Sequence, residues 1–163
     1  MKIKIVTENS ESLTDLLCQL SAYYSAGSVD RKKSRLHIDM NLLGRNSPSQ
    51  LVAAYNENGS VMGFAAIILM HSLVNHHDSN NRQCQIKELF VSKDYRGQAV
   101  GEALMQWVAA YALRQGCCRM DWNVKSNNLR GIKFYEGLGG QKVADRLSYR
   151  IQGVDFLKLA GAE

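Results

Sequence analysis

The chain has 163 residues, of which 45% are hydrophobic and 21% charged, with a net charge of +5. These values are typical of one compact folded domain, residues 1–163, and exclude a disordered chain. The longest apolar run, residues 61–70, falls far short of the ~18 residues of a membrane span, so we expect a soluble chain without membrane contact. The first residues lack the apolar stretch of a secretory signal, which predicts a cytoplasmic location.

Cysteines, histidines and basic residues limit the partners of the chain. The four cysteines, Cys18, Cys84, Cys117 and Cys118, lack Cys-x-x-Cys spacing, and no histidine spacing selects a metal ligand. We therefore expect free thiols and no metal site. The positive charge favours a polyanion, either a nucleic acid or a multiply phosphorylated cofactor. Because the basic residues are scattered and no nucleic-acid-binding motif is present, we expect no nucleic-acid partner.

Local patterns in the first half predict a strand, two helices and a hairpin. Residues 3–5 alternate as a short strand. Ser12 and Asp15 resemble a capping box ahead of a first helix that extends to Tyr24. Leu36, Met40 and Leu43 predict a second helix that ends before Pro48. Residues 51–55 and 61–69 form a predicted hairpin, and the polar residues 75–83 a loop.

The second half predicts strands interleaved with helices. A strand at 85–92 leads to a long helix with an apolar stripe from Val100 to Tyr111, closed by Gly116. A strand at 117–124 precedes a helix that Asn128 and its neighbours cap and that ends at Gly139–Gly140. Residues 143–151 and 154–159 are predicted as final strands. Strands alternating with helices indicate an α/β fold.

The junction between the strand and the long helix, residues 89–101, is the most informative segment. It turns through small residues into a helix whose first N–H groups and dipole suit phosphate oxygens. The alternative is a tight connection that merely requires glycine. Neither the P-loop nor the dinucleotide-binding fingerprint matches.

Two motifs carry a resemblance to a known family. Residues 96–101, Arg-Gly-Gln-Ala-Val-Gly, resemble the Gln/Arg-x-x-Gly-x-Gly/Ala motif of the GNAT superfamily of acetyl-coenzyme-A-dependent N-acetyltransferases, except that Ala99 stands where glycine is usual. Residues 128–139 resemble the second signature, Asn-x-x-Ala-x-x-x-Tyr-Glu-x-x-Gly, with Gly131 in place of alanine. The order of predicted elements is also similar to that of the family, including Gly63 early in the third strand.

The resemblance implies a single-domain, mixed, mostly antiparallel sheet flanked by helices and splayed between the strand ending near Val91 and the strand at 117–124. Acetyl-coenzyme A would enter the gap, its pantetheine arm pairing with the backbone of Phe90 and Val91. The pyrophosphate would be bound by the backbone amides of Arg96, Gly97, Gln98, Ala99, Val100 and Gly101. Lys93, Arg96 and Arg130 are candidates for the outer phosphates or are surface charges. Asn128 contacts the cofactor in the family but is equally an N-cap candidate.

Two residues are catalytic candidates. Tyr135 matches the family position of the general acid, and a neutral phenol can protonate the leaving thiolate. Alternatively it is a core aromatic beside Ile132 and Leu138. Glu88 points away from Leu89 and Val91 by strand alternation and is the candidate base. Its alternative role is a surface ion pair with a neighbouring lysine.

The predicted activity is therefore transfer of an acetyl group from acetyl-coenzyme A to the primary amine of a small molecule by direct attack. The alternatives are acetylation of a protein N-terminus or lysine, and a non-catalytic coenzyme-A-binding domain. The sequence also leaves a homodimer open. By resemblance, the acceptor groove combines three carboxylates with seven cations, which favours a monoamine, such as an amino acid, over a polyamine. Those groups are Asp39, Asp78 and Glu88 against Arg31, Lys32, Lys33, Arg35, Arg45, Arg82 and Lys87.

Overall fold

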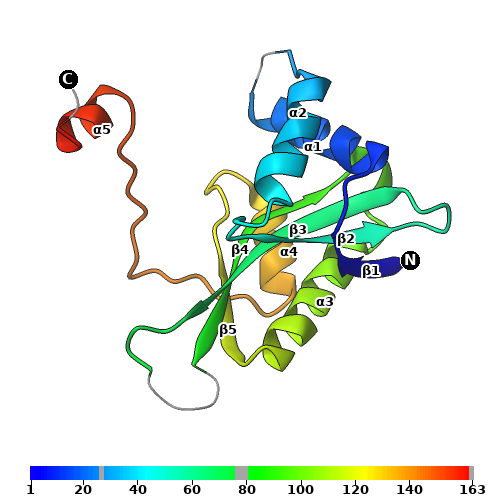
Figure 1. Cartoon of the computed structure of the whole chain (residues 1–163). Coiled ribbons are helices and arrows are strands. Elements are labelled where there is room, and N and C mark those ends of the chain that lie inside the picture. The colour runs from blue at the N-terminus through cyan, green and yellow to red at the C-terminus, as the bar shows by residue number, and fades with distance from the viewer. Residues whose placement is uncertain (26–27, 76–80, 162–163) are drawn as a thin grey trace. The chain divides into compact units, whose positions relative to one another are not determined.

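The computed structural model describes residues 1–25, 28–75 and 81–161. The chain divides into two compact units, residues 1–123 and 124–163, and each is described by itself. The first unit holds the sheet and three of the α-helices, and the second holds the other two (Figure 1).

The sheet of the first unit has five strands in the order β1-β2-β3-β4-β5. They are β1 (Lys2–Ile5), β2 (Gln50–Tyr55), β3 (Val61–His71), β4 (Arg82–Val91) and β5 (Cys117–Trp122). Every neighbouring pair is antiparallel except β4 and β5, which are parallel. The predicted mixed, mostly antiparallel sheet is therefore confirmed, as is the β2–β3 hairpin. β4 begins three residues earlier than predicted, and residues 76–80 of the predicted loop lie outside the described residues.

The first helix, α1 (Glu11–Tyr24), is capped differently from the prediction. Ser10, not Ser12, is the N-cap, and its hydroxyl accepts a hydrogen bond from the Leu13 N–H at 3.2 Å. The Ser12 hydroxyl instead accepts from the backbone N–H of Val61 at 3.1 Å, and Asp15 pairs with Arg31 at 2.8 Å. The predicted capping box is thus wrong because both of its side chains bind groups outside α1.

The second helix is α2 (Arg31–His37), which continues into a π-helical turn, η1 (Ile38–Leu42). The predicted apolar stripe along it is wrong. Leu36 and Met40 are 58% and 72% exposed, whereas Ile38 is fully buried. The π-helical turn explains the difference, because it breaks the α-helical period on which the predicted spacing rests.

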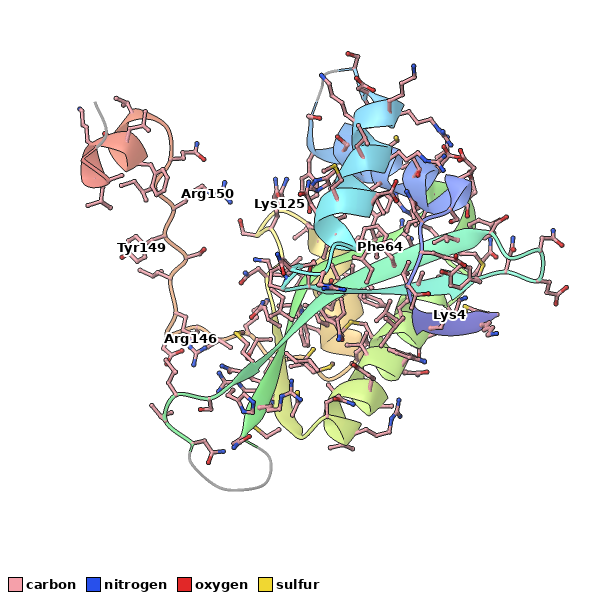
Figure 2. The ribbon with its side chains drawn as sticks, in the orientation of Figure 1. Lys4, Phe64, Lys125, Arg146, Tyr149 and Arg150 are labelled. Carbon is pink, nitrogen blue, oxygen red and sulfur yellow. The ribbon has the colours of Figure 1, made fainter. Side chains whose placement is uncertain are left out.

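Helices cover both faces of the sheet. On one face, Leu13, Leu16 and Ile38 of α1 and η1 belong to a core cluster with Phe64 and Phe90 of the strands. Figure 2 labels Phe64 on β3. α3 (Val100–Arg114) contacts β2, β3, β4 and β5 and buries the residues Val100, Leu104, Met105, Val108 and Ala112. Covering on both sides explains why residues 51–54 of β2 are all buried instead of alternating.

The second unit contains α4 (Leu129–Gly137) and α5 (Val154–Leu159). The two strands predicted at 143–151 and 154–159 are wrong. Residues 141–152 contain no strand, and 154–159 form a helix that begins after Gly153, whose φ is +62°. A strand requires a hydrogen-bonded neighbour, and the described residues of the second unit form no other strand that could supply one.

Candidate functional site

The sheet opens at the end of β4. β4 pairs with β3 as far as Val91, but its pairing with β5 ends at Ile86. From Lys87 onward, the edge of β4 that faces β5 has no strand partner among the described residues. The predicted splay is therefore confirmed, and it leaves backbone groups on which an extended ligand can pair as a strand does.

A bulge sets the direction of Glu88. Glu88 lies opposite Ala66 and Ile86 lies opposite Ile67, so Lys87 is an extra residue in β4. Successive residues of β3 face opposite sides, and Glu88 therefore lies on the face opposite to that of Ile86. This is the face covered by α1, and it matches the predicted orientation of Glu88 away from Leu89.

Glu88 is half-buried and is bound by a residue that sequence reasoning missed. The hydroxyl of Tyr24, the last residue of α1, donates a hydrogen bond to Glu88 Oε2 at 3.0 Å. Tyr24 in turn contacts Tyr23 edge to face at 5.1 Å, and Tyr23 lies 6.4 Å from Phe90. The carboxylate is thus held at one edge of an aromatic cluster. No sequence signal links Tyr24 to a residue 64 positions away.

The turn from β4 into α3 has an unusual backbone. After the short 3-10 helix η2 (Lys93–Tyr95), Gly97 has a φ of +79° and Ala99 a φ of +57°. Ala99 is the one non-glycine residue with positive φ in the described part of the chain. It is also the N-cap of α3, and no side chain caps that helix. The first N–H groups of α3 therefore have no side-chain partner at the cap, and binding of the pyrophosphate by the amides of residues 96–101 stays a prediction.

Side chains of the same turn bind backbone oxygens. Arg96 Nε donates to the Val91 carbonyl at 3.2 Å, and its guanidinium lies 5.7 Å from the centre of the Phe90 ring. Gln98 Nε2 donates to the Asp94 carbonyl at 3.0 Å. Arg96 thus donates to the carbonyl of the last residue of β4. The family resemblance predicts that the pantetheine arm pairs with the backbone at this residue. Lys93 is exposed.

Gly63 allows the strands to approach closely beneath this turn. A Cβ atom at residue 63 would lie 2.9 Å from the Phe90 carbonyl oxygen and 3.3 Å from a methyl group of Val100. Both neighbours belong to the predicted cofactor site. A side chain at this position would therefore displace either the end of β4 or the start of α3.

The second unit carries the remaining candidates. Asn128 is the N-cap of α4, and its Oδ1 accepts a hydrogen bond from the Gly131 N–H at 3.0 Å. Gly131 fits this arrangement because a Cβ there would lie 2.6 Å from Asn128 Nδ2. Tyr135 is half-buried and contacts Phe134 edge to face at 5.1 Å, and Arg130 is exposed. Contacts of Asn128, Arg130 and Tyr135 with the cofactor stay predictions.

Two further observations concern other site types. In residues 1–25, 28–75 and 81–161, no cluster of three or more His, Cys, Asp or Glu side chains could hold a metal ion. Over the same residues, none of the helices has the length and apolar character needed to cross a membrane.

Sequence comparison matches residues 13–139 to the model of the acetyltransferase (GNAT) family. The chain is 34% identical over 88 residues to thialysine N-epsilon-acetyltransferase of Mus musculus, covering 49% of each chain. It is 32% identical over 68 residues to L-ornithine N5-acetyltransferase NATA1 of Arabidopsis thaliana, covering 42% of this chain and 30% of the relative. The chain thus spans about half or less of the length of these curated relatives.

Solved structures share the whole architecture. The V. cholerae integron cassette protein VCH_CASS6 superposes with a TM-score of 0.88 at 28% identity, over 99% of this chain and 98% of that chain. The aminoglycoside N-acetyltransferase AAC(6′)-Iy, solved with CoA, has a TM-score of 0.64 at 20% identity over 93% of this chain and 100% of that chain. The latter likeness shows the fold alone. The family match, which extends over most of the sequence, identifies the chain as a member of the acetyltransferase (GNAT) family.

Proposed function

We propose that the chain is an N-acetyltransferase that transfers the acetyl group of acetyl-coenzyme A to the primary amine of a small molecule. One observation carries the proposal: the unpaired end of β4 lies directly before the uncapped N-terminus of α3, in a chain of the acetyltransferase family. The first feature suits the amides of a pantetheine arm and the second suits a pyrophosphate.

Cofactor binding in this proposal uses mainly the backbone. Phe90 and Val91 hold the pantetheine arm, and the amides of residues 96–101 hold the pyrophosphate. Because Arg96 Nε binds the Val91 carbonyl, this hydrogen bond opens when the pantetheine arm takes that carbonyl. The released guanidinium is then free to pair with a phosphate, an interaction in which arginine is stronger than lysine. Lys93, Arg130 and Asn128 are the further cofactor contacts that we propose.

The chemistry requires a base that deprotonates the amine and an acid that protonates the leaving thiolate. An aliphatic amine is protonated near neutral pH, so Glu88 takes one proton, directly or through a water, before the nitrogen attacks the thioester carbonyl. The C–N bond forms, the tetrahedral intermediate collapses, and the C–S bond breaks. Tyr135 gives its phenolic proton to the leaving thiolate and regains one as the nitrogen loses its second proton on becoming the amide, while Glu88 releases the first proton to solvent. The products are the N-acetyl amine and coenzyme A.

The names of the relatives support a small acceptor. Thialysine and ornithine are amino acids that carry a primary amine on the side chain, and both relatives are named for acetylating them. We therefore propose an amino acid with a side-chain amine as the acceptor class, since its carboxylate offsets one of its two ammonium charges. Acetylation of a protein N-terminus or lysine is the alternative that the experiment below separates.

The test measures release of coenzyme A thiol from acetyl-coenzyme A in the presence of ornithine, thialysine, lysine, spermidine or short peptides. We expect turnover with a small amine, and Tyr135→Phe should lower kcat by about 10²-fold while calorimetry shows unchanged cofactor binding. Tyr111→Phe is the control, since the Tyr111 hydroxyl of α3 donates a hydrogen bond to Gln50 of β2 at 3.1 Å, both in the first unit, whereas Tyr135 belongs to the second. Absence of a binding signal at millimolar acetyl-coenzyme A contradicts the proposal, and turnover with peptides alone favours the alternative.

A further inference from the structure

The turn of the β2–β3 hairpin, residues 56–60, is organised by the side chain of Asn56. Its Oδ1 accepts hydrogen bonds from the backbone N–H groups of Asn58 at 3.0 Å and of Ser60 at 2.9 Å. The backbone N–H of Asn56 donates to the Ser60 carbonyl at 3.0 Å, and Gly59 has a left-handed backbone with a φ of +77°. Asparagine side chains that accept from the backbone two residues on are common in turns. The turn therefore fixes both the position and the rotation of the Asn56 amide.

The same amide also forms a hydrogen bond outside the hairpin. Because two N–H donors face Oδ1, the NH2 group of the amide must point the other way. Nδ2 donates to the hydroxyl of Tyr95 at 3.2 Å, across 39 positions of the sequence. Asn56 and Tyr95 are both half-buried. Asn56 thus joins the hairpin to the segment between β4 and α3.

Tyr95 lies immediately before the turn proposed for the pyrophosphate. It is the last residue of η2, and residues 96–99 follow it. Its backbone N–H donates to the Ser92 carbonyl at 3.0 Å, and the buried Ser92 donates through its own N–H to the Met62 carbonyl at 2.9 Å. Met62 belongs to β3. The start of the segment is therefore attached to the β2–β3 hairpin at two points, the Met62 carbonyl and the Asn56 side chain.

Residues 96–99 depend on this attachment. All four are exposed, and the side chains of Arg96 and Gln98 donate to carbonyls at positions 91 and 94, close by in the sequence. Ala99 holds a left-handed backbone, which costs free energy for a residue with a side chain. A turn of this kind takes other conformations when its start is released. A ligand must then supply the free energy that orders the turn, and its apparent affinity falls.

We propose that Asn56 is a positioning residue for the acetyl-coenzyme A site and that it acts through the Tyr95 hydroxyl. The hydrogen bond holds the chain at Tyr95, so that the backbone amides of residues 96–101 keep the arrangement that binds the pyrophosphate. This inference rests on the proposed function, because it takes that turn as the cofactor site. It gives the β2–β3 turn a part in cofactor affinity. Loss of one neutral hydrogen bond should weaken cofactor binding by roughly three- to tenfold.

The first experiment removes the hydroxyl and leaves the hairpin turn intact. In Tyr95→Phe, calorimetry should show a Kd for acetyl-coenzyme A that is raised by roughly three- to tenfold. The KM for acetyl-coenzyme A should rise with it, while kcat at saturation and the KM for the acceptor stay within about twofold of the wild type. Tyr55→Phe is the matched control, because it removes a phenol from the residue before Asn56, and it should leave the Kd unchanged. The Tyr55 ring lies 5.1 Å from the Lys4 ammonium.

The second experiment tests whether Asn56 acts through Tyr95. Asn56→Asp keeps one oxygen for the two N–H groups of the turn, and its second oxygen can accept from the Tyr95 hydroxyl. It should therefore bind acetyl-coenzyme A about as tightly as the wild type, whereas Asn56→Ala should lose at least as much affinity as Tyr95→Phe. The double variant Asn56→Ala, Tyr95→Phe should bind no more weakly than Asn56→Ala alone, because both changes remove the same hydrogen bond. Thermal unfolding without ligand checks that each variant is folded. If Asn56→Ala does not fold, Tyr95→Phe and Asn56→Asp decide the question.

Three results would overturn the role of Asn56 and leave the proposed function standing. The first is an unchanged Kd in Tyr95→Phe, with or without a loss of thermal stability. The second is a loss of affinity in Asn56→Asp as large as that in Tyr95→Phe. The third is a pair of losses that add in the double variant. Failure of the wild type itself to bind acetyl-coenzyme A is a different result, since it overturns the proposed function and this inference together.

Discussion

Ala99 adopts a strained backbone conformation in the turn from β4 into α3. The turn into α3 holds Ala99 in the left-handed conformation, with a φ of +57°. The family motif that this segment resembles usually has glycine at the position.

 A side chain in this conformation costs about 1–2 kcal/mol, and glycine avoids that cost while giving the unfolded chain more freedom.

We expect Ala99→Gly to raise the free energy of unfolding by about 1 kcal/mol and to tighten acetyl-coenzyme A binding, since the methyl group also leaves the proposed phosphate site. Urea unfolding and calorimetry are the measurements. Ala103→Gly, one turn further into α3, is the control and should lower stability by about 1 kcal/mol. A loss of stability in Ala99→Gly would show that the turn is not strained at this residue.

The pair Tyr24 and Glu88 is the second feature at this scale. The Tyr24 hydroxyl holds Glu88 Oε2 at 3.0 Å, so Tyr24 is a positioning residue for the proposed base. Tyr24→Phe should lower kcat/KM by about tenfold, and the same change should have little effect in a Glu88→Gln background, because coupled residues are not additive.

Tyr23→Phe is the matched control, since it removes the neighbouring phenol and leaves the bond between Tyr24 and Glu88 in place. Equal losses from Tyr24→Phe in both backgrounds would mean that Tyr24 acts independently of Glu88.

Of the pair Tyr24 and Glu88, only Glu88 was predicted from the sequence. The orientation of Glu88 was predictable because no irregularity interrupts β4 between residues 88 and 91. Tyr24 was not, because a contact across 64 residues depends on how α1 packs on the sheet. The capping error at Ser12 has the same origin, since its hydroxyl binds Val61 on another element.

At the scale of elements, the contact between β3 and the end of β4 depends on Gly63. A Cβ at this residue would lie 2.9 Å from the Phe90 carbonyl, and the backbone must move to admit it. We expect Gly63→Ala to lower the free energy of unfolding by about 1–3 kcal/mol and to weaken cofactor binding, because the displaced strand carries the proposed pantetheine site. Thermal unfolding with and without acetyl-coenzyme A measures both effects.

Gly137→Ala provides the control for Gly63→Ala. A Cβ at residue 137 meets nothing within 4 Å, and the residue lies in α4, so alanine should stabilise by up to about 1 kcal/mol. If Gly63→Ala leaves both the stability and cofactor binding unchanged, the close approach of β3 to the end of β4 is not needed for the site.

Elements were predictable where their pattern is local. The β2–β3 hairpin and the long helix α3 follow from turn residues and apolar spacing within short windows, and both are confirmed. The segment 143–151 has an equally good strand pattern, but a strand forms only beside another strand. The local sequence indicates that residues 143–151 favour an extended conformation, but it does not indicate whether a second strand lies beside them.

For the whole molecule, the prediction of one domain over residues 1–163 stays a prediction. The family match crosses from the first unit into the second, since it runs from residue 13 to residue 139. Both units therefore contribute to the shared family region, and residues 140–163 follow it. The cytoplasmic location likewise stays a prediction.

The structure changes the count of charged groups at the acceptor groove, from which the acceptor class was predicted. Arg31 pairs with Glu11 and Asp15, and Arg35 pairs with Glu11, acids that the count from sequence omitted. These two arginines lower the pKa of the Glu11 carboxyl by hydrogen bonding and charge. Two of the seven cations thus serve to join α1 to α2. The number of carboxylates in that count is unchanged at three, of which Asp78 lies outside the described residues and Glu88 accepts a hydrogen bond from Tyr24.

An acceptor with several ammonium groups and no carboxylate of its own is therefore poorly matched, because each uncompensated positive charge needs an acidic partner. We expect kcat/KM at fixed salt to be at least tenfold higher for ornithine than for spermidine, as the proposed acceptor class requires. Putrescine is the matched control compound, since it differs from ornithine by the carboxylate alone. If the remaining cations bind that carboxylate, kcat/KM should be lower for putrescine than for ornithine. The difference between the two kcat/KM values should decrease as added salt screens the attraction. A tenfold preference for spermidine would overturn the proposed acceptor class and leave the family assignment intact.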